Sequence, residues 1–141
     1  MKSNLQCIML VDDNADDNFY HERVINKFNH STVVITKDSG LAALEHLSSK
    51  NETLNNKPDL IFLDINMPGM NGWEFLKEYS KLDKKMQSKL IIIMLTTSDN
   101  PDDESRAKNL SFVSDYITKP LTKELMEEIT RKYFINESII D

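Results

Sequence analysis

This sequence is nearly free of cysteine, and it has no long hydrophobic run and no surplus of positive charge. Its single cysteine, Cys7, excludes an internal disulfide framework and a zinc site built from several cysteines. Its apolar runs are four to six residues long, far short of the about 18 residues that a membrane-spanning helix needs. The N-terminus carries one lysine, Lys2, and lacks the longer apolar run of a signal peptide. We therefore expect a cytoplasmic chain without membrane insertion.

The charge balance is acidic, with 17 lysines and arginines against 23 aspartates and glutamates and a net charge of −6. Nucleic acids and anionic lipids both attract positively charged surfaces, so neither is an expected partner. The 141 residues make about one domain, since domains usually run to roughly 100–200 residues. We predict a single domain over residues 1–141, with a core at about 5–134 and a short tail at 135–141.

Short continuous apolar runs predict strands that are covered on both faces, as in a parallel sheet. The strong runs are residues 7–11, 60–63 and 90–95, and weaker runs at 33–35 and 116–117 complete a sheet of five. Helical spacing of apolar residues between these runs predicts helices at about 15–28 and 40–49, after Asn71, from Pro101 and after Thr122. Asn14 and Asn71 are placed as N-caps. The polar segment 50–57 is predicted to be an exposed loop.

Five strand–helix units in succession favour right-handed crossovers and a parallel sheet with helices on both faces. The predicted fold class is therefore α/β, a five-stranded doubly wound sheet. Open sheets of this kind bind ligands beyond the carboxyl ends of their strands. Polar residues follow the predicted strands at this edge: Asp12 and Asp13, Asp64, Thr96 to Ser98, and Thr118 to Pro120.

Three carboxylates at one edge, from Asp12, Asp13 and Asp64, would repel one another unless a cation lies among them. Oxygen ligands alone indicate a hard cation, and a partly hydrated one indicates Mg²⁺. Together with Lys119 and the Thr96 hydroxyl, the set is typical of phosphoryl transfer, in which one carboxylate attacks phosphorus.

These residues also have ordinary structural interpretations. The two aspartates could form a solvated acidic turn, Thr96 could cap the next helix, and Lys119 could be a surface lysine. Their joint placement at strand ends favours the functional interpretation. Triad chemistry and a zinc site are not expected, because all histidines fall on predicted helices or helix ends, away from this edge. These are His21, His30 and His46.

Four motifs in order resemble those of response-regulator receiver domains. Residues 11–14 resemble the acidic pair of that family, and residues 64–72 resemble its phosphoacceptor loop, D-x-x-M-P-x-x-x-G. Residues 95–98 resemble its hydroxyl motif, and residues 116–120 resemble its switch aromatic followed by a Lys-Pro pair. The resemblance covers about Leu5 to Tyr133 and implies the flavodoxin-like (βα)5 receiver fold.

The resemblance implies a role for each matching residue. Asp64 would be the nucleophile that accepts a phosphoryl group from a histidine kinase or a His-phosphotransfer protein. Asp13, Asp64 and the backbone carbonyl of Asn66 would ligate Mg²⁺ directly. Asp12 would act mainly through a metal-bound water.

The remaining motif residues would sense the phosphoryl group. Lys119 would pair with its oxygens and Thr96 would hydrogen-bond them, with Thr97 and Pro120 in support. The Lys119–Pro120 bond is expected to be cis. Tyr116 would turn inward as Thr96 moves and so reshape the surface of the fourth helix, fifth strand and fifth helix. For Tyr116 an ordinary packing role stays open.

The leading prediction is a stand-alone response regulator, a self-phosphorylating and dephosphorylating phosphoacceptor and not a turnover enzyme. Eight residues follow Tyr133, so we expect output through an unknown protein target or a phosphorelay, as a monomer or a phosphorylation-dependent dimer. One alternative is a haloacid-dehalogenase-like Mg²⁺-dependent phosphatase. That family has a second aspartate, a general acid, two residues after the nucleophile, where this sequence has Asn66. A degenerate receiver that acts only by binding is the other. Neither Asn66 nor Ser98 is an acid, so neither offers a general base for dephosphorylation.

Overall fold

Strands and helices alternate along the chain in the computed structural model, which describes residues 4–49, 57–82 and 90–134. The elements in chain order are β1 (Cys7–Val11), α1 (Ala15–Phe28), β2 (Val33–Lys37), α2 (Gly40–Ser48), β3 (Leu60–Leu63), α3 (Gly72–Tyr79), β4 (Ile91–Thr96), α5 (Pro101–Lys108), β5 (Asp115–Thr118) and α6 (Lys123–Tyr133). The predicted alternation is confirmed. The predicted tail at 135–141 and all but Lys57 of the predicted loop at 50–57 lie outside the described residues.

The strands form one parallel sheet of five in the order β2-β1-β3-β4-β5. β1 and β3 are buried along their whole length, because strands lie on both sides and helices cover both faces. β2 and β5 are the edge strands and are only partly buried. Their position at the edges explains why their apolar runs are the weaker ones in the sequence. The doubly wound flavodoxin-like fold is confirmed.

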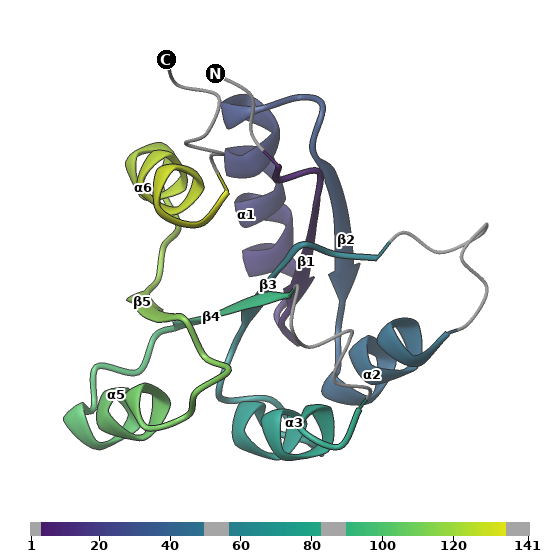
Figure 1. Cartoon of the computed structure of the whole chain (residues 1–141), viewed down its shortest axis with the longest axis vertical. Coiled ribbons are helices and arrows are strands. Elements are labelled where there is room, and N and C mark those ends of the chain that lie inside the picture. Colours follow the sequence, from purple (N-terminus) through teal and green to yellow (C-terminus); the bar gives the residue numbers. More distant parts are fainter. Residues whose placement is uncertain (1–3, 50–56, 83–89, 135–141) are drawn as a thin grey trace.

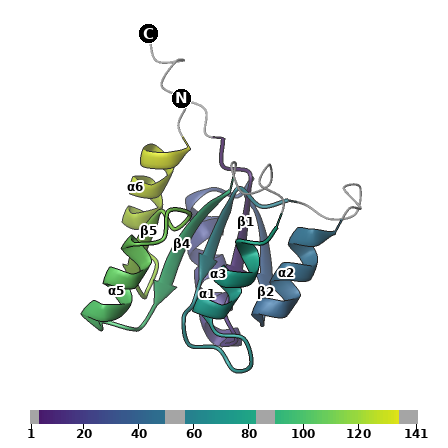
Figure 2. The same cartoon turned by 60° about the horizontal axis from the view of Figure 1, so that its bottom comes forward.

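Helices lie on both faces of the sheet (Figures 1 and 2). Alternate side chains of each strand enter separate cores on the two faces. On one face Met9 and Ile61 pack with residues of α2, α3 and α5. On the other face Ile8 and Phe62 pack with residues of α1 and α6. Both faces are thus closed to water, while the carboxyl ends of the strands stay open for polar groups.

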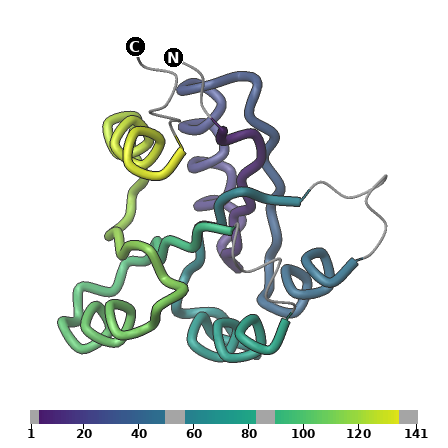
Figure 3. The backbone as a smooth tube through the Cα atoms, in the orientation of Figure 1, coloured from purple at the N-terminus to yellow at the C-terminus, as the bar shows by residue number. Residues whose placement is uncertain are grey.

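The two ends of the described chain meet beside α1 and α6. The backbone N–H of Asn4 donates to the carbonyl of Phe134 at 2.8 Å (Figure 3).

Cys7 lies at the start of β1, and burial raises the pKa of its thiol to about 11. Within the described ranges, no helix is both long and apolar enough to span a membrane.

Side-chain caps begin the helices that follow the strand ends. Asn14 accepts a hydrogen bond from the backbone N–H of Asp17 at the start of α1. Asn71 and Glu74 form a reciprocal capping box at the start of α3. Both predicted caps are confirmed. Since caps satisfy otherwise unpaired backbone donors, they hold the turns between strand and helix in place.

Two glycines shape the loop between β3 and α3. Gly69 has a φ of +74°, in the left-handed region that favours glycine. Gly72 begins α3, and its N–H donates to the carbonyl of Ile65 at 2.8 Å. A Cβ on Gly72 would lie 2.6 Å from the carbonyl oxygen of Asp64. The close approach of α3 to the backbone of Asp64 therefore requires glycine at this position.

Gly72→Ala is expected to lower the free energy of unfolding by about 1–3 kcal/mol, because the new methyl group meets backbone that cannot rotate away. Gly40→Ala is the matched control, since Gly40 is the first residue of α2. Its Cβ would meet the Sδ of Met70 at 2.8 Å, the far end of a flexible side chain, so the cost should be below about 1 kcal/mol. Urea denaturation of both variants checks the difference. Equal losses would contradict this account of the loop.

Candidate functional site

Three carboxylates meet at the carboxyl edge of the sheet, where β1 and β3 end side by side. Asp12 follows β1 and Asp64 follows β3, and the residues that precede them, Val11 and Leu63, are in register. With Asp13, their carboxylate oxygens lie within 4.8 Å of one another. Asp12 and Asp64 are 5% and 6% exposed, whereas Asp13 is open to solvent. Buried charges this close are costly without a compensating cation.

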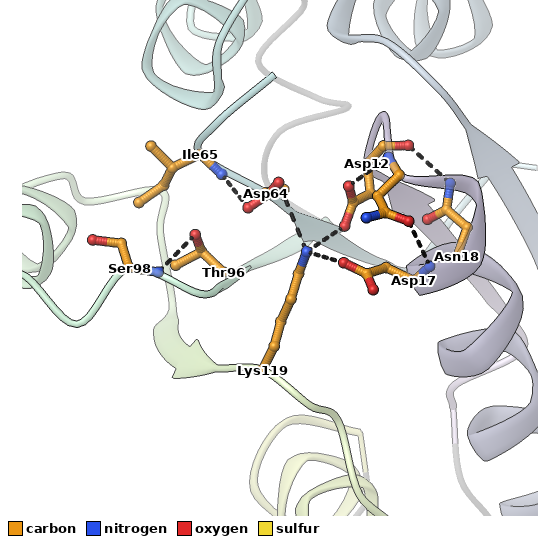
Figure 4. Close-up of polar contacts among 9 residues, drawn as sticks. Asp12, Asp17, Asn18, Asp64, Ile65, Thr96, Ser98 and Lys119 are labelled. Atoms are coloured by element: carbon orange, nitrogen blue, oxygen red, sulfur yellow. Dashed lines mark hydrogen bonds and ion pairs between the residues drawn. The ribbon is translucent and has the colours of Figure 1, made fainter. Parts of the chain in front are cut away.

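One ammonium group from the end of β5 compensates part of this charge. The side chain of Lys119 points toward the three aspartates Asp12, Asp17 and Asp64 (Figure 4). Its Nζ lies 2.6 Å from Asp12 Oδ2, 2.7 Å from Asp17 Oδ2 and 3.8 Å from Asp64 Oδ2. The backbone N–H of Lys119 donates to the carbonyl of Thr96 at 2.8 Å, so the end of β4 positions the base of this side chain.

The charged form of Asp64 is disfavoured at its buried position. Burial raises its pKa, and the negative charge of Asp12 raises it further. Lys119, the Thr96 hydroxyl and the N–H of Ile65, which donates to Asp64 Oδ1 at 2.9 Å, act in the opposite direction. The pKa of Asp64 is raised overall, which shows that the neighbouring donors do not fully compensate the burial of its charge.

The charged form of Lys119 is favoured although its side chain is only 10% exposed. Burial alone would lower its pKa, but the hydrogen bonds to Asp12 and Asp17 and the charge of Asp64 outweigh it, and the pKa is raised. Together with Asp13, four carboxylates therefore surround a single ammonium. The site has an excess of negative charge and attracts further cations.

The donor set fits a magnesium ion. Every group in the cluster of Asp12, Asp13 and Asp64 offers oxygen, the ligand atom that hard divalent cations prefer. Asp12, Asp13 and Asp64 could each offer a carboxylate oxygen to such an ion. The cluster contains no histidine or cysteine, so its chemistry does not suit zinc.

Thr96 connects the carboxylate site to the loop after β4. It ends β4, is fully buried, and its Oγ1 accepts a hydrogen bond from the N–H of Ser98 at 3.3 Å. The carbonyl of Ser98 accepts from the Tyr116 hydroxyl at 2.9 Å. The Ser98 hydroxyl donates to Asp103 Oδ2 in the first turn of α5 at 2.6 Å. The loop after β4 is thus tied to Thr96, to β5 and to α5 at once.

The remaining predicted residues lie at the rim. Asn66, Thr97 and Pro120 are exposed, and only the backbone carbonyl of Asn66 was expected to act as a ligand. The Lys119–Pro120 peptide bond is cis, as the resemblance implies. Tyr116 is half-buried against the core and bonded to the loop after β4, so it has both a packing contact and a link to the site.

The sequence analysis missed Asp17 and Asn18 of α1. Acidic residues in the first turn of a helix are ordinary complements of its dipole, and this interpretation hid the ion pair of Asp17 with Lys119. Asn18 is buried, and its Nδ2 donates to the carbonyl of Asp12 at 2.9 Å. Their spacing from Asp12, within two turns of the capped helix, was the available signal.

The prediction that all three histidines lie away from the acidic edge was wrong for His21. This residue is 3% exposed and lines a small cavity of about 10 Å³ together with Asp12, Asn18 and Asp64. Burial lowers its pKa, and the nearby charge of Lys119 lowers it further. It approaches the site because it lies one turn after Asp17 and Asn18 on α1.

Comparison with known proteins agrees with this arrangement. The model of the family described as the response regulator receiver domain matches residues 8–131. A crystal structure of a two-component response regulator from Cytophaga hutchinsonii has a TM-score of 0.82 and 29% identity, covering 92% of this chain and 97% of that one.

Curated relatives include proteins of very different length. Response regulator Rcp1 of Synechocystis sp. is 33% identical over 113 residues, which cover 79% of this chain and 75% of that protein. Hybrid signal transduction histidine kinase L of Dictyostelium discoideum is 29% identical over 119 residues, which cover 84% of this chain. The chain spans only 7% of that kinase's length.

Asp64→Asn is expected to raise the free energy of unfolding in metal-free buffer at pH 7, by about 1–3 kcal/mol, because it removes a crowded buried charge. The pKa of Asp64 is raised in the folded state, so ionisation of this group destabilises the folded wild type. The free energy of unfolding of the wild type therefore falls as the pH rises from the unfolded pKa of Asp64 through its folded pKa. The gain should therefore be smaller at pH 4 than at pH 7. Urea denaturation at both values measures it.

The matched control is Asp16→Asn, which neutralises an exposed aspartate in the first turn of α1 and should change stability by less than about 0.5 kcal/mol. An Asp64→Asn variant that is no more stable than the wild type at pH 7 would contradict the charge crowding described above.

Proposed function

The chain belongs to the response regulator receiver family of two-component signalling, and we propose that it accepts a phosphoryl group on Asp64. Receiver domains are in general phosphoacceptors and not turnover enzymes, and they are phosphorylated by histidine kinases or phosphotransfer proteins. The proposal treats the chain as one receiver domain with a core at about residues 5–134, working in the cytoplasm where such donors present their phosphohistidine.

One observation carries this proposal: the three clustered carboxylates lie directly beside the ammonium of Lys119 at the carboxyl edge of the sheet. Burial raises the pKa of Asp64, so a phosphoryl group would relieve this carboxylate of its buried charge. Transfer to this oxygen carries the negative charge outward onto phosphoryl oxygens, where Lys119 and the Thr96 hydroxyl can stabilise it.

The transfer itself needs no further catalytic side chain. A carboxylate oxygen of Asp64 attacks phosphorus, the bond from phosphorus to the donor breaks, and its electron pair leaves with the donor group. Asp64 then carries an acyl phosphate, and a phosphohistidine whose other ring nitrogen already carries a proton leaves as a neutral imidazole. The chain's own part is to align Asp64 and to supply Lys119 for the charge that develops on the phosphoryl oxygens.

Receiver domains typically bind Mg²⁺ at an acidic pocket, and the aspartate cluster of this chain is a pocket of that kind. A bound Mg²⁺ would supply positive charge for the phosphoryl oxygens and for the excess of carboxylates. We propose Asp13, Asp64 and the backbone carbonyl of Asn66 as its direct ligands, with Asp12 acting through water.

We propose that phosphorylation changes the surface formed by α5, β5 and α6. Phosphorylation adds about −1.5 to −2 charge and new acceptor oxygens, so the hydroxyl of Thr96 gains a partner. The N–H of Ser98 donates to the Thr96 hydroxyl, and the hydroxyl of Tyr116 donates to the carbonyl of Ser98. A shift of Thr96 would therefore move Ser98 and, through it, Tyr116. This couples the charge at Asp64 to a surface that a protein target or a second receiver can bind.

The donor would dock beside the acidic edge. Phe19 and Tyr20 of α1 are 64% and 50% exposed, and the guanidinium of Arg23 lies over the Phe19 ring at 5.8 Å from its centre. By analogy with the family, this part of α1 is the expected contact for a kinase or a phosphotransfer protein. We propose two outputs for the protein: transfer of the phosphoryl group to another histidine in a relay, or direct binding of a target.

The structure disfavours a phosphatase of the haloacid-dehalogenase kind. Such an enzyme requires a general acid two residues after its nucleophile. This position holds Asn66, an exposed amide. A degenerate receiver that acts only by binding would not need the full set of carboxylates with Lys119. Phosphorylation of the protein distinguishes a competent receiver from a degenerate one.

Incubation with acetyl phosphate and Mg²⁺ is expected to add the mass of one phosphoryl group to the intact protein. The gain should be absent in Asp64→Ala and in the wild type with a chelator, because the nucleophile or the cation is then missing. Intact-mass spectrometry measures each sample.

Asp16→Ala is the control, since it removes an exposed aspartate of α1 and should keep the gain. A folded wild type that gains no mass, or an equal gain in Asp64→Ala, would contradict the proposed function.

A further inference from the structure

The ammonium of Lys119 is engaged on the α1 side of the site and not on Asp64. It donates hydrogen bonds to Asp12 at 2.6 Å and to Asp17 at 2.7 Å, whereas Asp64 Oδ2 lies 3.8 Å away, beyond hydrogen-bond distance. Figure 4 shows Lys119 between Asp17 on one side and Asp64 on the other. Two of the three donors of the ammonium are therefore used by residues other than the proposed phosphoacceptor.

A closed ring of hydrogen bonds holds Asp17 in this position. The N–H of Asn14 donates to Asp12 Oδ1 at 2.9 Å, and the N–H of Asp17 donates to Asn14 Oδ1 at 3.1 Å. Lys119 closes the ring by donating to Asp17 Oδ2 and Asp12 Oδ2. Asp17 is thus fixed by the capped start of α1, and its side chain is 35% exposed while its Oδ2 accepts from the ammonium at 2.7 Å.

Phosphorylation of Asp64 would place additional hydrogen-bond acceptors near the same ammonium. The phosphoryl oxygens bear more negative charge than a carboxylate and would draw Lys119 toward Asp64. Asp12 also binds the ammonium but belongs to the carboxylate cluster beside Asp64, whereas Asp17 lies outside that cluster. A Lys119 that moves toward the phosphoryl group therefore weakens or breaks its hydrogen bond to Asp17.

We propose that Asp17 is a positioning residue that holds Lys119 away from Asp64 and thereby limits how far the site is phosphorylated. The inference rests on the proposed function and deepens it, because it assigns Asp17 a part in setting the balance between the two states. The carboxylate acts only through Lys119 and is not itself a catalytic residue.

Asp17→Asn is expected to raise the ratio of phosphorylated to unphosphorylated protein about fivefold at a sub-saturating concentration of acetyl phosphate, the size of effect that one partly exposed ion pair has on an equilibrium. Asp16→Asn is the matched control: it removes the same charge from the same helical turn, and the ratio should stay within about twofold of the wild type. Intact-mass spectrometry with Mg²⁺ gives the ratios, and thermal melts verify folding.

A Lys119→Met background separates positioning from a general effect of charge. If Asp17 acts through Lys119, adding Asp17→Asn to Lys119→Met should change the ratio by less than about twofold, the non-additivity expected of residues that interact. Asp17→Glu keeps the carboxylate and should stay close to the wild type.

The outcomes separate the inference from the proposed function. A wild type that is phosphorylated while Asp17→Asn shows the same or a lower ratio overturns the inference alone. So does a rise that Asp16→Asn reproduces, that Asp17→Glu shares, or that persists in the Lys119→Met background. A wild type that is not phosphorylated overturns the proposed function and the inference with it.

Discussion

A single ammonium group among four carboxylates is the interaction on which this site depends. Lys119 lies within 4 Å of Asp12, Asp17 and Asp64, and Asp13 completes the acidic cluster. Among the described residues, one positive charge cannot neutralise four negative ones, so the site is short of positive charge. Burial, together with the charge of Asp12, raises the pKa of Asp64. The same shortage supports three proposed properties of the site: binding of a divalent ion, transfer of charge from Asp64 onto a phosphoryl group, and competition for Lys119.

The order of the strands makes this convergence possible. Asp12 and Asp64 meet because β1 and β3 are neighbours in the sheet although they are far apart in the sequence. Lys119 follows β5 at the edge, and its backbone bond to Thr96 places its long side chain across the ends of the inner strands. The capped start of α1 and the close approach of Gly72 to Asp64 then hold the surrounding turns. Two well-packed cores thus support a polar edge that is itself poorly balanced in charge.

Much of this arrangement could be predicted from the sequence, because continuous apolar runs and capping residues are local signals. The runs at 7–11 and 60–63 and the helix over 15–28 coincide with β1, β3 and α1. Asp17 and His21 escaped prediction for a physical reason. Each has an ordinary role on an isolated helix. Only the packing of α1 beside β1 and the reach of the Lys119 side chain from the end of β5 bring them together at the site. The bonds of Ser98 to Tyr116 and Asp103 likewise depend on how α5 and β5 pack.

The most direct test of the central claim is a crystal structure of the protein with Mg²⁺ and beryllium trifluoride, a mimic of the phosphoryl group. The account predicts the mimic on a carboxylate oxygen of Asp64, with the ammonium of Lys119 within hydrogen-bond distance of a fluorine and no longer bonded to Asp17. A mimic bound elsewhere, or one on Asp64 that leaves Lys119 in its present position between Asp12 and Asp17, would contradict it.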